Sequence, residues 1–321
     1  SDGTLIISNC NFTNNTASGH GGAVFLGSSD GNTITNCYFE GNVAGGNGGA
    51  IDWYAGSSDG EIIGSTFTEN TAKRSGGAVH WSGHYGTIKD SNFTHNIATG
   101  DEISEIGGIQ GGGDGGAVLW VGSNGTVDNC IFVDNFAQYR GGAIFLHGNS
   151  TENCTNTTVS NSNFEDNVAG LNGGAIDWQK GAHDGRLVNS NFTNNTAWRS
   201  GGAVYWYGIN GTITNCDFNG NDAVGNVTVH DKHIVTYETV GGNGGAITWT
   251  GSDGIVYKST FTNNTATNKG GAVYLQGSTQ GLCNNTNFDT CTFISNIAGV
   301  NGGAIDWYRG ARNGHVLNSI F

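Results

Sequence analysis

Gly48-Gly49-Ala50-Ile51-Asp52-Trp53 is the stretch that decides the fold, because its core, Gly-Gly-Ala-Ile/Val, returns along the whole chain. The motif occurs ten times, with its alanine at positions 23, 50, 78, 117, 143, 175, 203, 246, 272 and 304. A second motif, Phe-x-x-Asn, alternates with it ten times, from Phe12 to Asn296, and Phe321 begins a further copy. Two interleaved motifs at a spacing of about 27 residues indicate a repeat architecture.

Each repeat contains three short extended segments separated by Gly and Asn turns. Examples are Gly48 to Trp53, Gly211 to Thr214, and Asn36 to Phe39. Short runs rich in β-branched and aromatic residues, bounded by turn residues, are typical of strands. We therefore predict an all-β fold, a right-handed parallel β-helix of about ten coils of ~27 residues, with three strands per coil. We expect residues 1–321 to form one continuous domain.

Alternation within the first segment predicts which side chains are buried. Val or Ile always follows the alanine, and Leu or Trp comes two residues later, so both are expected to face inward. The residue between them varies and is expected to face solvent: Phe25, Asp52, His80, Leu119, Phe145, Asp177, Tyr205, Thr248, Tyr274 and Asp306. The Asn that follows each Phe predicts an amide ladder along a turn.

The coils also follow a longer period. Near-identical Asn-Gly-Gly-Ala-Ile-Asp-Trp segments begin at Asn47, Asn172 and Asn301. Four coils therefore form a super-repeat of 120 to 129 residues. Insertions are predicted near residues 99–111, 149–160, 224–241 and 278–290. Because the chain starts and stops within a super-repeat, we expect it to be a window of a longer repetitive chain.

Composition narrows the class of function. The chain has 57 Gly, no Pro and no Met, and its net charge is −14 with only 12 Lys+Arg. Glycine at fixed places among Trp, Phe, Ile and Val favours an ordered solenoid over a linker. The acidic balance disfavours nucleic acid and anionic membranes as partners. No apolar run reaches the ~18 residues that a membrane span needs.

The seven cysteines allow two interpretations. Five of them occupy the inward position two residues before Phe: Cys10, Cys37, Cys130, Cys216 and Cys291. Stacked residues of adjacent coils lie within disulfide range, which makes Cys10–Cys37 a candidate bridge. Cys154 and Cys283 lie in equivalent insertions, so Cys130–Cys154 and Cys283–Cys291 are further candidate bridges. The alternative is a set of buried free thiols that fill a slot for small residues. Because no Cys-x-x-Cys occurs, a zinc site is not expected.

Asn-x-Ser/Thr sequons are dense, and an exported protein would carry glycans on several of them. Three of the sequons, at Asn11, Asn92 and Asn191, directly precede the core Phe on the predicted outer face. The full set of candidate sites is Asn11, Asn14, Asn92, Asn124, Asn149, Asn153, Asn156, Asn191, Asn194, Asn210, Asn226, Asn263 and Asn284.

The recurring acidic residues Asp52, Asp177 and Asp306 are expected on one outward face, as exposed ion pairs or contacts between copies. Lys180 and Arg309 follow two of them by three residues. Catalysis would need a second carboxylate or a base beside each, and none recurs, so no catalytic, cofactor or metal residue is predicted. Weaker alternatives are calcium at Asp101, Glu102, Glu105 and the Ser-Asp-Gly turns, and a metal ion at His230 and His233.

Gly-Gly-Ala-Ile/Val together with Phe-x-x-Asn in every coil resembles two sets of surface proteins. One is the polymorphic outer-membrane proteins of chlamydiae; the other is the adhesin-like proteins of methanogenic archaea. The stretch from Asn191 to Ala197 (Asn-Phe-Thr-Asn-Asn-Thr-Ala) is closest to the archaeal set. The resemblance implies an exported β-helix of the cell envelope or an adhesin, and it names no ligand.

Two functions of different classes follow. The first is an extracellular scaffold or adhesin that acts by polyvalent display and by lateral or end-to-end self-association, as part of a sheath, wall or fibre. Its partners would be copies of itself, or glycans or proteins of neighbouring cells. The alternative is a β-helical polysaccharide lyase or hydrolase, which rests on fold analogy alone.

Overall fold

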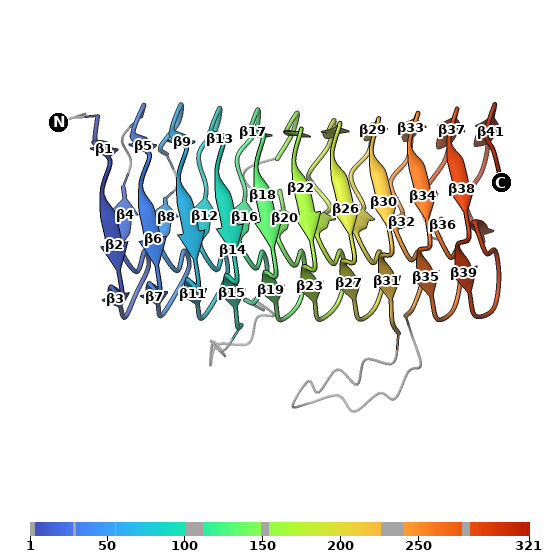
Figure 1. The fold of residues 1–321 in the computed structure, drawn as a ribbon. Coiled ribbons are helices and arrows are strands. Elements are labelled where there is room, and N and C mark those ends of the chain that lie inside the picture. Colours follow the sequence, from blue (N-terminus) through green and yellow to red (C-terminus); the bar gives the residue numbers. More distant parts are fainter. Residues whose placement is uncertain are drawn as a thin grey trace, which may run out of the picture.

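The computed structural model describes residues 4–27, 30–54, 56–100, 112–148, 154–225, 241–277 and 283–321. Its 41 short strands form four parallel sheets, each of which runs the whole length of a rod (Figure 1). Neighbouring strands come from successive coils and pair in register, so that Phe67 lies beside Phe39 and Phe93. The predicted parallel β-helix is confirmed.

The first two sheets match two of the predicted segments. Sheet A contains β1 (Ile6–Ser8), β5 (Thr33–Thr35), β9 (Glu61–Ile63), β13 (Thr87–Lys89), β17 (Thr126–Asp128), β21 (Thr158–Ser160), β25 (Arg186–Val188), β29 (Thr212–Thr214), β33 (Ile255–Tyr257), β37 (Asn287–Asp289) and β41 (His315–Leu317). Sheet B contains β2 (Asn11–Thr13), β6 (Tyr38–Glu40), β10 (Thr66–Thr68), β14 (Asn92–Thr94), β18 (Ile131–Val133), β22 (Asn163–Glu165), β26 (Asn191–Thr193), β30 (Asp217–Asn219), β34 (Thr260–Thr262) and β38 (Thr292–Ile294).

The other two sheets meet at the Gly-Gly motif. Sheet C contains β3 (Thr16–Ala17), β7 (Val43–Ala44), β11 (Thr71–Ala72), β15 (Ile97–Ala98), β19 (Phe136–Ala137), β23 (Val168–Ala169), β27 (Thr196–Ala197), β31 (Asp222–Ala223), β35 (Thr265–Ala266) and β39 (Ile297–Ala298). Sheet D contains β4 (Val24–Leu26), β8 (Ile51–Trp53), β12 (Val79–Trp81), β16 (Val118–Trp120), β20 (Ile144–Leu146), β24 (Ile176–Trp178), β28 (Val204–Trp206), β32 (Ile247–Trp249), β36 (Val273–Gln276) and β40 (Ile305–Tyr308).

Two details of the sequence prediction were wrong. A coil has four strands, not three, because the two residues after each ladder Asn form sheet C, a strand too short to show alternation. The predicted insertions at 149–160 and 278–290 also ended too late. Residues 158–160 and 287–289 of these ranges belong to β21 and β37, which pair with the strands of the neighbouring coils.

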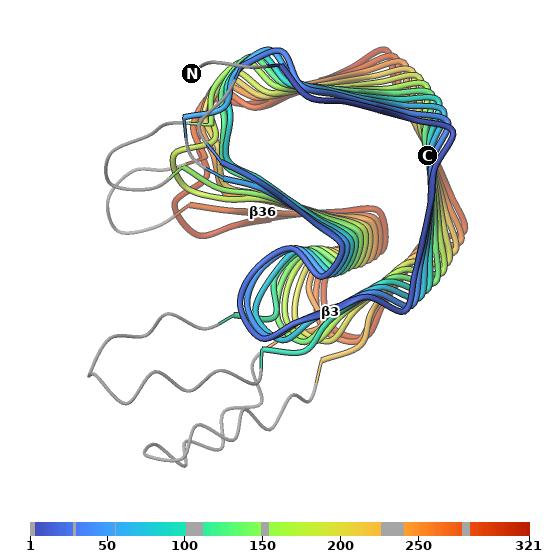
Figure 2. The same ribbon diagram turned by 90° about the vertical axis from the view of Figure 1, so that its left-hand side faces the viewer.

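The chain folds back on itself between sheets C and D. Figure 2 shows sheet D, represented by β36, running inside the outline of the coil rather than along its edge. The Gly-Gly pair makes this possible. Gly49 has no room for a side chain, since a Cβ there would lie 2.7 Å from the backbone of Thr71 in the next coil. Gly48, with φ of +65°, supplies the turn that L residues rarely adopt.

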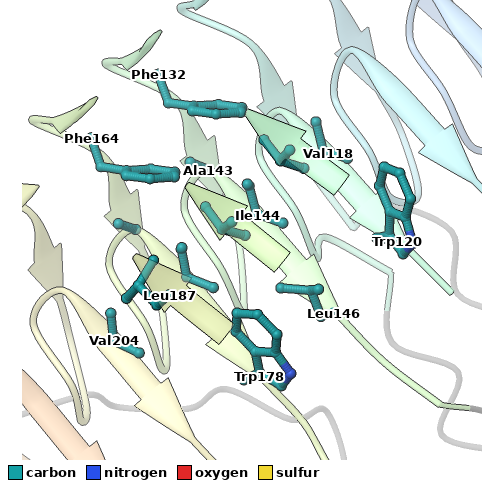
Figure 3. Packing of buried hydrophobic residues seen from close by; sticks show 14 of the residues in the cluster. Val118, Trp120, Phe132, Ala143, Ile144, Leu146, Phe164, Trp178, Leu187 and Val204 are labelled. Carbon is teal, nitrogen blue, oxygen red and sulfur yellow. The ribbon is translucent and has the colours of Figure 1, made fainter. Parts of the chain in front are cut away.

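The core lies among sheets A, B and D and consists of stacked columns. Phenylalanine rings of sheet B stack along the rod with centroids 4.7 to 5.0 Å apart, from Phe12 to Phe321. On sheet D, indole rings stack in groups of three, such as Trp178, Trp206 and Trp249. Figure 3 shows the column where Leu146 lies between Trp120 and Trp178.

In coils where the sheet D column has Leu in place of Trp, the residue just before the sheet A strand is larger. Where the coil has Trp206, the facing residue is Gly211, and a Cβ there would lie 2.3 Å from the indole. Where the coil has Leu146 or Leu275, the equivalent residue is Thr157 or Thr286. Both threonines are fully buried, so a larger neighbour compensates for the smaller core side chain.

The predicted amide ladder is confirmed between sheets B and C. Asn135 Nδ2 donates to the Asn167 Oδ1 at 2.9 Å and to the Phe93 carbonyl at 3.0 Å. Its Oδ1 accepts from the backbone N–H and the Nδ2 of Asn96, both at 3.0 Å. The ladder side chains of the inner coils are thus buried and fully hydrogen-bonded.

We expect Gly211→Thr to lower stability by about 1–3 kcal/mol through overpacking against Trp206. Adding Trp206→Leu reproduces the Leu146–Thr157 pair and should restore part of the loss. The denaturation midpoints of the two single variants and the double variant measure the coupling. Strictly additive effects would contradict the size compensation.

We expect Asn135→Ala to cost at least about 3 kcal/mol, because it leaves several buried donors and acceptors without partners. Asn163→Ala is the matched control, since Asn163 is exposed on sheet B and accepts one hydrogen bond from Asn191. Its effect should stay within about 0.5 kcal/mol. Equal losses in chemical denaturation would show that the ladder is not a special stabiliser.

Candidate functional site

The most charged part of the interior is a seam of two columns that face each other where the chain folds back. One column consists of the second residue of each sheet D strand, which varies between coils and was predicted to face solvent. The other is the residue before each Gly-Gly-Ala: His20, Asn47, Ser75, Asp114, Arg140, Asn172, Ser200, Asn243, Lys269 and Asn301. The predicted exposure of Asp52 and Asp177 was therefore wrong, since both are 0% exposed.

A basic residue faces the recurring Asp once in every super-repeat. In the first copy, His20 Nδ1 lies 3.0 Å from Asp52 Oδ2, and His80 Nδ1 lies 2.9 Å from Asp52 Oδ1. In the second and third copies the basic residues are Arg140, near Asp177, and Lys269, near Asp306. His20, Arg140 and Lys269 each lie more than thirty residues before the Asp that they face, and His80 lies 28 residues after Asp52, so sequence proximity did not reveal them.

Arg140 joins several parts of the seam. Its Nε and Nη2 donate to the two carboxylate oxygens of Asp114, both at 2.9 Å. Its guanidinium also lies 4.6 Å from the centre of the Phe145 ring. Burial raises the pKa of Asp114 to about 6, although the pair with Arg140 acts in the opposite direction. At neutral pH the Asp114–Arg140 pair is thus ionic and holds two coils of the folded-back segment together.

Asp177 is less well compensated. Gln179 Nε2 approaches its Oδ2 at 3.4 Å, while its Oδ1 has no hydrogen-bond donor among the described residues. Burial raises the pKa of this carboxyl well above its ordinary value, and the Arg140 charge opposes only part of that effect. Because neither Asp52 nor Asp177 has exposed area, no substrate atom can reach them in this conformation.

The predicted partners of these carboxylates lie elsewhere. Lys180 and Arg309 are exposed, and within the described ranges neither forms an ion pair with Asp177 or Asp306. Asp306 itself is half-buried. The seam therefore locks the folded-back segment to sheet D instead of presenting an outer charged face.

The cysteines are all free thiols in this structure, and the three candidate bridges are not formed in it. Cys37 and Cys130 fill the small slot beside the Phe stack, where other coils have Ser. Cys154 and Cys283 lie instead before sheet A in the coils of Leu146 and Leu275, each next to the buried threonine of its coil, at 3.7 and 4.0 Å. Burial raises the pKa of Cys154 to about 12, so its thiol is protonated and unreactive at neutral pH.

Most of the predicted glycan sites lie on the surface. Exposed asparagines are Asn11, Asn14, Asn92, Asn156, Asn191, Asn194, Asn210 and Asn263, while Asn124 and Asn284 are half-buried. Asn149, Asn153 and Asn226 lie outside the described residues, as do His230, His233, Asp101, Glu102 and Glu105. In the part of the chain that is described, no three His, Cys, Asp or Glu side chains gather as metal ligands.

The two longer insertions begin and end at equivalent points of the coil, four coils apart, which is roughly 19 Å along the axis. Each has a narrow base. A Cβ on Gly100 would lie 2.8 Å from the Gly112 oxygen, and a Cβ on Gly225 would lie 3.2 Å from the Gly242 nitrogen. The returning segment donates a backbone hydrogen bond to the Arg74 carbonyl in one copy, from Gly113, and to the Arg199 carbonyl in the other, from Gly242. The chain thus presents equivalent attachment points in successive super-repeats.

We expect the incompletely hydrogen-bonded carboxyl of Asp177 to make the protein more stable as the pH falls. A carboxyl whose folded pKa is raised binds its proton more tightly in the folded state, so stability declines as pH rises above the unfolded value. Asp114 strengthens this pH dependence between pH 3.8 and about pH 6, because its pKa is raised from the first value to the second. Denaturation of Asp177→Asn should show a weaker pH dependence than wild type and no loss of stability at neutral pH. A clear loss at neutral pH would contradict the raised pKa.

Within the described ranges, no helix has the length and apolar character to cross a membrane. No curated protein sequence matches this chain. A family model described as a Chlamydia polymorphic membrane protein repeat matches residues 258–276. This match supports the relation to the chlamydial repeats; it does not show the archaeal relation.

Solved structures share the architecture at low identity. A mutant tailspike protein of the E. coli bacteriophage HK620, in complex with pentasaccharide, is 10% identical with a TM-score of 0.54; the match covers 92% of this chain and 49% of the tailspike. This chain therefore spans about half the length of that protein. A mannuronic acid specific polysaccharide family 6 lyase from human gut microbiota is 13% identical with a TM-score of 0.52. The match covers 99% of this chain and 75% of the lyase.

A GH87 alpha-1,3-glucanase in complex with tetrasaccharides is 10% identical with a TM-score of 0.51, and the match covers 99% of this chain and 62% of the glucanase. These identities establish the fold alone. The family model described as a right-handed beta helix region matches residues 1–183, which is more than half of the chain. The chain therefore belongs to the right-handed β-helix family.

Proposed function

We propose that this chain is a non-catalytic extracellular scaffold, part of a cell envelope or an adhesive fibre, that acts by polyvalent display. The observation that carries the proposal is the four-coil module. A basic residue stands near the recurring Asp in three copies, and the insertion base recurs in two, all in one continuous register. An array of equivalent surfaces suits many weak contacts with a repetitive partner, because linked contacts raise the effective concentration of the next one.

A surface location is supported by the chlamydial membrane-protein repeat at residues 258–276. The partners we propose are further copies of the chain and glycans of the envelope. Exposed sequons such as Asn194 and Asn263, both in left-handed turns, are accessible for glycosylation in an exported protein. Calcium at the Ser-Asp-Gly turns stays a prediction.

A polysaccharide lyase or hydrolase is the second candidate. It is favoured by the similar solved structures, whose descriptions include a polysaccharide lyase and a glucanase. Such an enzyme needs acid and base groups that touch the sugar. The recurring carboxylates Asp52 and Asp177 have no exposed surface, so they do not supply those groups in this fold.

Electron microscopy and polymer-length measurements separate the two functions. Purified protein should form rods that associate side by side or end to end as its concentration rises. It should leave the length of laminarin, dextran and alginate unchanged on size-exclusion chromatography. Isolated rods at every concentration, together with shortening of any of these polymers, would favour the enzyme.

A further inference from the structure

Trp198 breaks the pattern that the other tryptophans follow. The chain has 8 Trp, and seven of them stand in the inward column of sheet D, where six are 0% exposed. Trp198 instead follows sheet C and is 46% exposed, in a coil far from either end of the rod. An indole exposed away from the ends of the rod calls for an explanation, since aromatic surface is normally buried.

Among the described residues, the backbone places Trp198 on a shelf between two small neighbours. It lies two residues after Thr196 of β27, so both side chains leave the same outer face of the coil. Parallel pairing continues past the strand, with Trp198 N–H donating to Ala169 and Val224 N–H donating to Ala197, both at 3.0 Å. Its neighbours in the adjacent coils are therefore Gly170, which has no side chain, and Val224, which is 36% exposed.

Polar groups of both kinds border the shelf. Asp222 pairs with Thr196 in the register of sheet C and is half-buried. Arg199, the residue after Trp198, is exposed, lies close enough to Tyr205 of sheet D to act on its charge, and has no ion pair within the described residues. An acceptor, a donor and a flat apolar ring thus lie within two coils, which is the combination that a pyranose ring with its C–H face and hydroxyl edge requires.

We propose that Trp198, with Asp222 and Arg199, forms a binding platform for a neutral polysaccharide; this rests on the scaffold function and names its partner. The indole stacks on the apolar face of one sugar. The Asp222 carboxylate accepts from a ring hydroxyl, and the Arg199 guanidinium donates to another. The ligand is neutral because the protein carries a net charge of −14 and the platform itself contains a carboxylate.

The equivalent coil of the first super-repeat lacks the platform and serves as an internal comparison. Lys73 stands where Trp198 does, Ile97 where Asp222 does, and Arg74 where Arg199 does. Gly45 occupies the position of Gly170. Lys73→Trp combined with Ile97→Asp would therefore build a second platform about 19 Å away, four coils along the axis.

Affinity electrophoresis of the whole chain tests the platform, with dextran, mannan or laminarin cast in the gel and alginate as the charged comparison. Wild type should be retarded by at least one neutral polymer and not by alginate. Trp198→Ala should weaken binding by about tenfold or more, the scale of one lost aromatic stacking partner. Trp198→Phe should keep most of the binding, and Ile255→Ala, at an exposed residue of sheet A, should keep all of it.

The Lys73→Trp/Ile97→Asp variant should be retarded more strongly than wild type. Retardation by none of the neutral polymers, stronger retardation by alginate, or unchanged binding of Trp198→Ala would each overturn the platform. The scaffold is judged separately by electron microscopy. Rods that associate normally but fail to bind sugar overturn the platform alone, whereas rods that bind sugar but never associate count against the scaffold.

Discussion

In-register parallel pairing of one coil with the next is the constraint on which this structure depends. It places each side chain directly above the equivalent residue of the neighbouring coil, at the spacing of hydrogen-bonded strands. Only residues that pack or bond well against themselves suit such a column. Phe rings satisfy this by stacking, and the ladder Asn satisfies it because one amide both donates and accepts. The ladder also bonds the Phe carbonyls, so it ties sheet B to the turn before sheet C.

The same constraint explains where coils are allowed to differ. A column tolerates a smaller residue only if another position of the same coil grows to fill the space, as with Leu146 and Thr157. Cys154, in the hydrophobic core of that coil, contributes to the filling. Serine and cysteine exchange freely before the Phe because both are small and direct their side chain to the carbonyl two residues earlier, as Ser65 and Cys37 do.

Much of this was open to prediction from the sequence, because repetition reveals columns without any structure. The Gly-Gly-Ala motif, the Phe stack and the amide ladder were each visible as invariant positions. Sheet C was missed because two residues cannot show a period of two. The seam was misplaced for a different reason. Alternation tells which side of a strand a residue occupies, but it cannot tell that the chain folds back to cover the outer side, as it does over Asp177.

Repetition also separates structure from function in this molecule. Residues that recur in every coil, such as the glycines of the motif, are required by the backbone geometry. A basic residue recurs once per super-repeat at one position of the folded-back segment, where Arg140 bonds to Asp114 and Lys269 lies over the Tyr308 ring. A residue that departs from both periods without a compensating change in its coil needs another cause. Trp198 is such a residue: it costs solvent exposure of an indole and contributes nothing to the stacked core, so its role is best sought in what the surface binds.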